Sequence, residues 1–474
     1  MKFWPLVPLL GGCAQIAGIE NTSGSGREGL SLAIERVSIG STIVRTPQDL
    51  TGLKAQYLLD VGPLDAAEVA PGTWGADVFD ATPPVVFDLP DDPGPRFDRL
   101  ATLPSKNLLA AFDVLEHPAP VASAPTDTIS VVATLDTAQV AETYELFVVG
   151  TWTVRGLEAP LAGTTTLAPA AFEIQSMASL TGRPIEQITL DDTPLILRRN
   201  GTTLTGVIEA TPFAQAAANE LTGAFGPLAA DQTLQATVDP TQATNRLGVA
   251  RPAITAGPNF AFTVNAAPGA EVGSTTGPLL VSGAVAMIDT AIAAAYPNPF
   301  VAKGWPAVLT YSAAGSRTLT PTAETLPVSL SAGMTQVIAD PAAGLVLDFP
   351  APVPEQVSIA GTSLSLDNVQ IAAPTAPVDV TVVVGTADAY VLELRALVPN
   401  ATNDALVAER KLFAIGREPA FSIPPEYLVA NTTYSIRIQT ITGLFPNIAD
   451  GDLNTRALPA ATAFVDTGVF RVMP

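Results

Sequence analysis

Apolar and polar residues alternate along much of this chain. The first clear case lies at residues 129–136. Its apolar members are Ile129, Val131, Ala133 and Leu135, which alternate with Ser130, Thr134 and Asp136. Successive side chains of a strand point to opposite faces, so this period of two predicts a strand with one face in the core. A second stretch of this kind has one face formed by Tyr144, Leu146, Val148, Trp152 and Val154.

A hairpin is predicted around Asn200-Gly201. Residues 195–199 and 202–205 are strand-like on either side of it. An Asn-Gly pair favours a two-residue turn because both residues accept positive φ. Residues 212–223 give the best short helix, since a proline stands near the first turn and a glycine at the end.

Clusters of proline and glycine interrupt the strand patterns. Such clusters at 158–171 and 296–300 mark turns or domain boundaries, because proline cannot continue a central strand. A short similarity between residues 85–90 and 345–350 hints at repeated units. No long amphipathic helix separates the strands, which argues against a parallel α/β sheet. We therefore expect an all-β fold of several antiparallel β-sandwich domains in tandem, with very short helices in loops.

A stretch near the C-terminus has a more specific pattern. Leu428, Thr432 and Tyr434 have the spacing Leu-x-x-x-Thr-x-Tyr. This resembles the Leu-x-Pro-x-Thr-x-Tyr corner and following strand of fibronectin type III domains, with Ala430 in place of the proline. The resemblance implies a fibronectin III-like or immunoglobulin (Ig)-like sandwich over residues 351–474, in which the Tyr434 hydroxyl bonds to nearby backbone.

Composition limits the class of protein. Hydrophobic residues make up 47% and charged residues 14% of the chain, with 43 prolines and 36 glycines. This content is enough for packed cores and is unlike that of a disordered chain. The net charge is −22. A nucleic-acid-binding protein needs a basic surface, so this charge argues against nucleic acid as a partner.

The N-terminus has the composition of an export signal. Lys2 precedes an apolar run at residues 3–10, which ends in Leu-Gly-Gly-Cys at Cys13, the one cysteine of the chain. The motif resembles the lipobox of bacterial lipoproteins, in which the cysteine is acylated and becomes the new N-terminus. The resemblance implies a palmitate-bearing Cys13 that holds the protein at a membrane, and Ala14 implies the outer membrane, on its periplasmic or its surface face. The alternative is an apolar N-terminal strand with a buried free cysteine.

These boundaries give an expected domain organisation. It comprises a signal peptide at 1–12, a lipidated cysteine and flexible tether at 13–29, a β-sandwich domain at 30–160, a β-rich domain at 170–300, a β-rich extension at 301–350 and a fibronectin III-like β-sandwich at 351–474. The tether is expected to be flexible because it is rich in small polar residues.

Two stretches resemble parts of catalytic sites. His117 is the one histidine of the chain, so a Ser-His-Asp triad would require it. We interpret His117 as a surface or turn residue. Asp466-Thr467-Gly468 resembles an aspartic-protease loop, with an imperfect second copy at Asp289-Thr290-Ala291. That chemistry needs two carboxylates that share a proton, and we interpret Asp466 as part of a turn. We therefore expect no catalytic residue.

Asp450, Asp452 and Asn454 place oxygen side chains at alternate positions, as at the start of a calcium loop. The EF-hand pattern requires Gly at position six and Glu at position twelve, where this chain has Thr455 and Ala461. These residues are a weak calcium candidate, and a solvated loop is the alternative. No other cofactor is expected.

The sequence favours a non-enzymatic extracytoplasmic lipoprotein that presents binding or spacer β-sandwich domains, with an envelope protein or polysaccharide as partner. One alternative is a surface adhesin or glycan-binding protein with Trp74, Trp152 or Trp305 as stacking platforms, although core packing is the commoner role of tryptophan. A further alternative is a secreted hydrolase with a site that the motifs do not reveal.

Overall fold

The computed structural model shows an all-β protein, as expected. It describes residues 30–40, 43–59, 62–76, 82–89, 97–115, 117, 128–136, 142–180, 185–186, 188–189, 192–210, 218–250, 257–268, 277–364 and 369–474. In this part of the chain one α-helix, α1 (Pro240–Ala250), accompanies the strands. None of the described helices combines the length and apolarity needed to cross a membrane.

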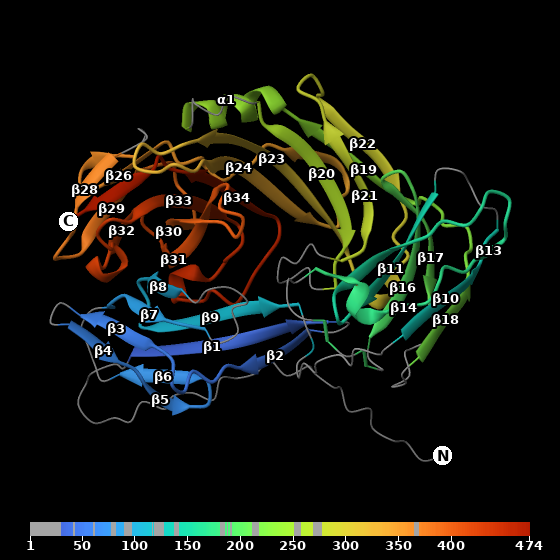
Figure 1. The fold of residues 1–474 in the computed structure, drawn as a ribbon, viewed down its shortest axis with the longest axis horizontal. Helices are drawn as coiled ribbons and strands as arrows, with labels where there is room; N and C mark the ends of the chain where they lie inside the picture. Colours follow the sequence, from blue (N-terminus) through green and yellow to red (C-terminus); the bar gives the residue numbers. More distant parts are fainter. Residues whose placement is uncertain are drawn as a thin grey trace, which may run out of the picture.

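The strands form four groups, each with an outer sheet packed against inner strands (Figure 1). Group I covers residues 30–114. Its outer strands are β1 (Leu30–Ile39), β2 (Ile43–Pro47), β5 (Ala67–Ala70), β6 (Thr73–Ala76) and β9 (Asn107–Val114), and its inner strands are β3 (Ala55–Leu59), β4 (Gly62–Asp65), β7 (Val85–Phe87) and β8 (Asp98–Thr102).

Group II covers residues 128–224. Its outer strands are β10 (Thr128–Thr134), β13 (Thr166–Leu167), β14 (Phe172–Glu173) and β18 (Ala218–Ala224). Its inner strands are β11 (Glu142–Val149), β12 (Thr153–Leu157), β15 (Ala178–Ser179), β16 (Thr193–Asn200) and β17 (Thr203–Glu209), and the short helix η1 (Ile174–Ser176) lies between β14 and β15.

Group III covers residues 232–347. Its outer strands are β19 (Gln232–Val238), β22 (Ala291–Tyr296) and β25 (Ala343–Leu347), and its inner strands are β20 (Asn259–Ala266), β21 (Leu279–Val285), β23 (Ala307–Leu319) and β24 (Val328–Ala339). Helix α1 connects β19 to β20, and η3 (Val301–Lys303) connects β22 to β23.

Group IV covers residues 356–473. Its outer strands are β26 (Gln356–Ile359), β27 (Thr362–Ser363), β29 (Val378–Val383) and β32 (Ala420–Ile423). Its inner strands are β28 (Val369–Ala372), β30 (Ala389–Pro399), β31 (Leu406–Gly416), β33 (Thr433–Thr442), β34 (Ala460–Asp466) and β35 (Phe470–Met473). The short helices are η4 (Pro425–Tyr427) and η5 (Ile448–Asp450).

Groups I to III share one order of strand pairing. The first outer strand of each group is antiparallel to a middle outer strand and parallel to the last one: β1 with β6 and β9, β10 with β13 and β18, and β19 with β22 and β25. The inner pairs correspond as well, since β3–β4, β3–β7 and β7–β8 match β20–β21, β20–β23 and β23–β24. Group IV repeats the order from β29 to β34, but the antiparallel β26 takes the place of the parallel last strand.

The inner strands of all four groups join into one sheet of 19 described strands. Strand β8 of group I pairs in parallel with β31 of group IV, β34 of group IV pairs with β24 of group III, and β17 of group II pairs with β21 of group III. Groups II and I meet where the Trp152 indole N–H donates to the carbonyl oxygen of Ile39. The four groups therefore follow one another around a ring, in which the last group contacts the first (Figure 1).

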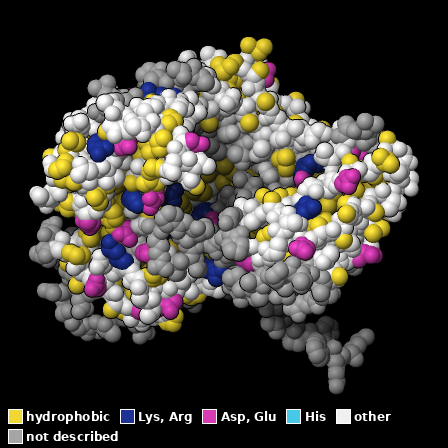
Figure 2. Space-filling model, viewed as in Figure 1, with side chains coloured by type: hydrophobic (Ala, Val, Ile, Leu, Met, Phe, Trp, Pro, Cys, Tyr) yellow, Lys and Arg dark blue, Asp and Glu magenta, His cyan; other side chains and the backbone are white. Residues whose placement is uncertain are grey.

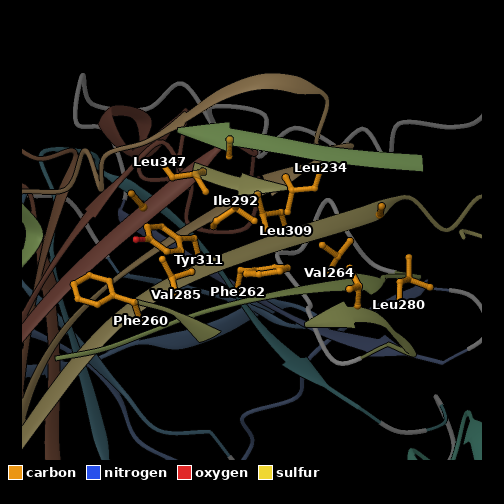
Figure 3. Close-up of a cluster of buried hydrophobic side chains, with 14 of the residues drawn as sticks. Leu234, Phe260, Phe262, Val264, Leu280, Val285, Ile292, Leu309, Tyr311 and Leu347 are labelled. Carbon is orange, nitrogen blue, oxygen red and sulfur yellow. The ribbon is translucent and has the colours of Figure 1, made fainter. Parts of the chain in front are cut away.

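The largest apolar cluster is centred on group III and extends into the neighbouring groups. Figure 3 shows Leu234, Ile292 and Leu347 of the outer sheet facing Leu309 and Tyr311 of the inner strands. All five side chains are buried. This packing removes both apolar faces from water, which is the main force that holds such facing sheets together.

Strand β30 is buried on both faces because it lies between two outer sheets. Leu392 and Leu394 pack into the core of group IV, whereas Ala389 and Val391 pack against the strands of group I. A strand of this kind has a nearly continuous apolar sequence and lacks the alternation typical of a half-exposed strand.

Several local predictions are confirmed. Residues 129–135 lie in and just after β10, and Ile129, Val131, Ala133 and Leu135 are buried. The hairpin predicted around Asn200-Gly201 also forms, since β16 and β17 pair as antiparallel strands. Its turn is one residue later than the prediction, however: Asn200 ends β16 opposite Thr203, the turn residues are Gly201 and Thr202, and φ is +57° at Gly201 but not positive at Asn200.

The helix expected at residues 212–223 is wrong where the structure describes it. Residues 218–224 form β18, which pairs in parallel with β10 and buries Leu221. Tertiary pairing overrides the weak helix propensity of this stretch. The α-helix instead follows Asp239, whose carboxylate accepts the backbone N–H of Gln242, with Pro240 at its first position. Asp at the N-cap and Pro at the first helical position are a favoured start of an α-helix.

The strand pairing also differs from the expected organisation. Each of groups I to III contains one parallel pair in its outer sheet, formed by its first and last outer strands. The pair is parallel because the last strand crosses over from the inner sheet. The sheets are therefore not purely antiparallel. The segment 158–171, expected as a boundary, lies inside group II, since β11 pairs with β16 across it. Residues 85–90 and 345–350 resemble each other in sequence, but β7 and β25 occupy different places in the shared strand order.

Candidate functional site

A pocket of about 510 Å³ opens at the junction of groups I and IV. Three aromatic residues line it: Phe97 just before β8, Tyr427 at the end of η4, and Tyr434 in β33. Its volume lies in the range of small-molecule sites, which are concave and combine apolar walls with a few polar groups. This pocket is therefore the candidate functional site.

One wall of the pocket is a tight corner before β33. The hydroxyl of Tyr434 accepts the backbone N–H of Val429 at 2.9 Å. Asn431 has φ of +64°, a conformation that asparagine tolerates better than most residues. Leu428 is buried in the same apolar cluster as Tyr434, whose ring stacks on Phe470. The bond between the Tyr434 hydroxyl and this backbone is the contact that the fibronectin III resemblance implies. Thr432 and Tyr434 also line the pocket.

A second wall joins the two groups through polar side chains. The Tyr427 hydroxyl donates to Oδ2 of Asp98, and Lys54 Nζ lies 2.8 Å from that oxygen and 3.2 Å from the Tyr427 hydroxyl. Burial raises the pKa of the Tyr427 phenol, and the hydrogen bond to Asp98 raises it further. Tyr427 therefore remains a neutral hydrogen-bond donor across the physiological pH range.

Two guanidinium groups lie against the ring of Phe97. Arg99 and Arg410 lie 4.3 and 4.7 Å from the centre of the ring. Cation–π contacts of this kind hold the ring in place. Phe97 is buried, so its ring presents little surface to the pocket.

The charged side chains around the pocket form two ion pairs and leave one carboxylate unpaired. Asp98 and Glu426 are acidic, whereas Lys411 is basic and Lys54 pairs with Asp98. Lys411 itself lies 2.5 Å from Glu409. Glu426 is exposed and has no partner among the described residues. On the face drawn in Figure 2, acidic and basic side chains are likewise interspersed over groups I and IV.

The ring of His117 contacts two carboxylates. It does not lie on the open surface, where the sequence suggested it. Its Nδ1 is 2.6 Å from Glu186 Oε2, and its Nε2 is 2.6 Å from Asp192 Oδ1. Burial lowers the pKa of His117, but the hydrogen bonds to Asp192 and Glu186 outweigh it and raise the pKa to about 10. Near neutral pH both ring nitrogens therefore carry protons, and neither can act as a base or bind a metal. Gly150 makes room for the contact, because a Cβ there would lie 1.7 Å from Asp192 Oδ1.

Asp466, the first residue of the protease-like motif, is buried and bonded to groups III and IV. Its carboxylate accepts Nε and Nη2 of Arg437 at 2.6 and 2.9 Å and the backbone N–H of Ser331 at 2.8 Å. Burial raises its pKa, but the hydrogen bonds and charge of Arg437 outweigh it and lower the pKa. The carboxylate of Asp289 instead closes its own turn by accepting the N–H of Ala286. Asp466 and Asp289 thus bind different partners and do not share a proton.

Two of the residues proposed for calcium, Asp452 and Asn454, have partners within their own loop or in group I, and the third, Asp450, is exposed. Asp452 Oδ1 accepts the backbone N–H groups of Asn454 and Thr455, both at 2.8 Å. The side-chain amide of Asn454 bonds to Glu35 and Arg45 of group I. Among the described residues, no group of three or more His, Cys, Asp and Glu side chains is placed to hold a metal ion. This loop links group IV to group I.

Trp74, Trp152 and Trp305 are all buried, so none forms an exposed stacking platform. Trp152 does not share the face of Tyr144, Leu146 and Val148, because the chain turns after β11. Its ring instead packs against Phe147 and its N–H reaches Ile39, both members of the cluster that also contains the core of group III. Its backbone φ is +50° in that turn. Cys13 lies outside the described residues.

No pattern in the sequence indicated Phe97, Asp98 and Tyr427 as pocket residues. Asp98 and Tyr427 are 329 positions apart, and no motif includes either of them. The one available signal was the position of Pro424, Pro425 and Tyr427 directly before the corner of Tyr434, where loop residues of a rigid scaffold commonly form binding sites.

No protein-family model matches the chain, and no curated protein matches it. Among solved structures, it is similar to a tetra-tandem repeat in the extending region of a large adhesion protein. That likeness has 12% identity and a TM-score of 0.11, over 93% of this chain and 97% of the other. A TM-score this low carries no argument about fold or function.

Proposed function

We propose that this chain is an extracytoplasmic lipoprotein, held in the envelope of a bacterium by lipid on Cys13, and that its β-rich body binds a ligand without catalysing a reaction. The observation that carries the binding role is the pocket built jointly by groups I and IV. A site shared by two firmly joined groups has fixed walls, and such preorganisation favours binding.

The contacts of His117 and Asp466 support a binding role over a hydrolytic one. Both ring nitrogens of His117 contact carboxylates, and Asp466 is held by Arg437 and Ser331. A general base needs a free lone pair within reach of a substrate proton. These two residues, the strongest catalytic candidates of the sequence, therefore stabilise the fold.

The same proposal includes the type of sandwich. In group IV the outer order β26–β29–β32 and the inner order β31–β30–β33–β34 resemble the two sheets of fibronectin III and Ig-like domains, and this resemblance supports the assignment. Groups I to III share this order except for their parallel last strand. The Tyr434 corner contact supports the assignment for group IV.

The lipid anchor is tested by labelling cells with radioactive palmitate and fractionating them. We expect the wild-type chain to carry label and to sediment with the outer membrane. The Cys13→Ser chain should carry no label and leave that fraction, because its hydroxyl cannot form the thioether to the lipid. Equal label and equal distribution in both would contradict the anchor.

Protease treatment of intact cells then determines the orientation. Loss of the body from intact cells would favour a surface adhesin. Protection until the outer membrane is opened would place the body in the periplasm.

A further inference from the structure

We propose that the pocket between groups I and IV binds a small primary alkylammonium ion, that is, a free organic amine in its protonated form. The inference rests on the binding function proposed above and deepens it by naming the class of ligand. Three features of the pocket carry it: the net charge of its lining, the hydrogen-bonding atoms that have no partner, and its exposed apolar surface.

The lining of the pocket carries an excess of negative charge. Two acidic side chains, Asp98 and Glu426, and one basic side chain, Lys411, belong to it. Lys411 is paired with Glu409. Asp98 is paired with Lys54, so the partners outside the lining leave the balance unchanged. The charge that remains is that of Glu426, an exposed carboxylate without a partner among the described residues. A cation is therefore attracted to the pocket, and an anion is repelled.

The strongest hydrogen-bonding atoms without a partner are acceptors. The donors at the pocket already contact carboxylates, since Lys411 Nζ lies 2.5 Å from Glu409 Oε1 and the Tyr427 hydroxyl donates to Asp98 Oδ2. The contacts of Asp98 all use Oδ2, so its Oδ1 and both oxygens of Glu426 have no partner among the described residues. Ionised carboxylates only accept hydrogen bonds. A ligand that matches this lining must supply donors, and an ammonium ion supplies several donors together with the complementary charge.

The apolar part of the lining suits the carbon chain of an amine. Ala396, Val398 and Val429 belong to it, and Val429 is 58% exposed. An alkyl chain that covers this surface removes it from water, which favours binding. A metal ion or a bare ammonium ion gains nothing from such contacts, so these side chains favour an organic cation.

The size of the pocket limits the ligand. A volume of about 510 Å³ lies in the lower half of the range for small-molecule sites. Such a pocket has room for a short alkyl chain with one or two amino groups. A lysine side chain of a partner protein presents the same chemistry, but its polypeptide would extend beyond the walls.

The test is isothermal titration calorimetry of the full chain in detergent near pH 7. n-Butylamine and putrescine are the amine probes, n-butanol and butyrate have a carbon chain without positive charge, and ammonium chloride has the charge without the chain. We expect both amines to bind and the other three probes to bind several-fold more weakly. No binding of either amine, or equal binding of n-butylamine and any of the other three, would overturn the inference.

A short peptide with blocked ends and one lysine distinguishes a free amine from a protein partner. We expect it to bind more weakly than n-butylamine, because its backbone does not fit between the walls. Tighter binding of the peptide would contradict a small free amine as the ligand.

Variants locate the binding. Glu426→Gln removes the charge of an exposed carboxylate without touching the core, and we expect it to weaken n-butylamine binding about fivefold, as loss of a partly exposed ion pair does. Glu418→Gln alters an exposed carboxylate away from the pocket lining and should leave the affinity unchanged. Equal affinities of Glu426→Gln and Glu418→Gln would place the amine elsewhere and refute the proposal.

A failure of this inference can be told apart from a failure of the proposed function. Palmitate labelling at Cys13 does not depend on the pocket. A chain that is labelled and membrane-bound but binds neither amine would retain the lipoprotein proposal and lose the organic cation.

Discussion

Asp466 links the strands of two groups through one buried carboxylate. It bonds to Arg437 of β33 within group IV and to the backbone of Ser331 in β24 of group III. The nearby Arg395 lies 3.3 Å from the same carboxylate and also contacts Glu393. Removing one member of a buried ion cluster leaves the other charges unpaired. The resulting loss in the free energy of unfolding exceeds what the ion pair itself contributes.

Asp466→Asn should therefore lower the free energy of unfolding by about 3–5 kcal/mol, measured by urea denaturation near pH 7. The control is Asp450→Asn, an exposed carboxylate, which should change it by less than about 0.5 kcal/mol. The folded-state pKa of Asp466 is lowered, so its contribution is present above the ordinary value of 3.8 and is lost as pH falls through the folded-state pKa. Equal stability of the two variants at neutral pH would contradict the role of Asp466.

His117 gives a second prediction, in the alkaline range. Its pKa is raised from 6.5 to about 10 in the folded state, so its stabilising contribution is complete below pH 6.5 and is lost as pH rises toward 10. The difference in free energy of unfolding between wild type and His117→Gln should shrink across this window, as measured by denaturant titrations at several pH values. A difference that stays constant from pH 6 to 10 would show that the ring is not protonated between its carboxylates.

At the scale of elements, strands of similar sequence differ in how far their side chains are buried. Strand β30 is covered on both faces, whereas all four residues of the edge strand β5 are exposed. Deleting buried methyl groups costs both their transfer free energy and the cavity that remains. An exposed side chain has neither cost.

Leu392→Ala in β30 should therefore lower the free energy of unfolding by about 2–5 kcal/mol. Val69→Ala in β5, where the side chain is 61% exposed, should change it by less than about 0.5 kcal/mol. Urea denaturation of both variants checks the contrast. A small effect of Leu392→Ala would show that β30 is not covered on both sides.

Elements with a strong local signal could be predicted from the sequence. The alternation of β10 and the Asn-Gly hairpin depend on neighbouring residues, and both were found. Strand β18 was mistaken for a helix because its partner, β10, lies about 90 residues earlier.

The pocket could not be predicted for the same reason. Tyr434 was recognisable from its corner, but Phe97 and Asp98 reach it only because β8 pairs with β31. Pairing between distant strands leaves no local pattern in the sequence.

At the scale of the whole molecule, the ring explains how four similar groups make one body. Each of the three inner-sheet junctions continues the backbone hydrogen bonding from one group to the next, and the contact of Trp152 with Ile39 closes the circle. The loop that carries Asn454 adds polar bonds between groups IV and I. The pocket depends on this closure, because Asp98 and Tyr427 come from the first and last groups.

Small-angle X-ray scattering of residues 30–474 tests the ring most directly, because a closed ring and an extended string of domains differ in radius of gyration. A compact body of this length should have a radius of gyration of about 22 Å. Four groups of about 100 residues arranged end to end, each about 13 Å in radius of gyration, would exceed about 35 Å. A value near 22–25 Å is the result that we predict, and a value above about 35 Å would contradict the ring and the pocket built across it.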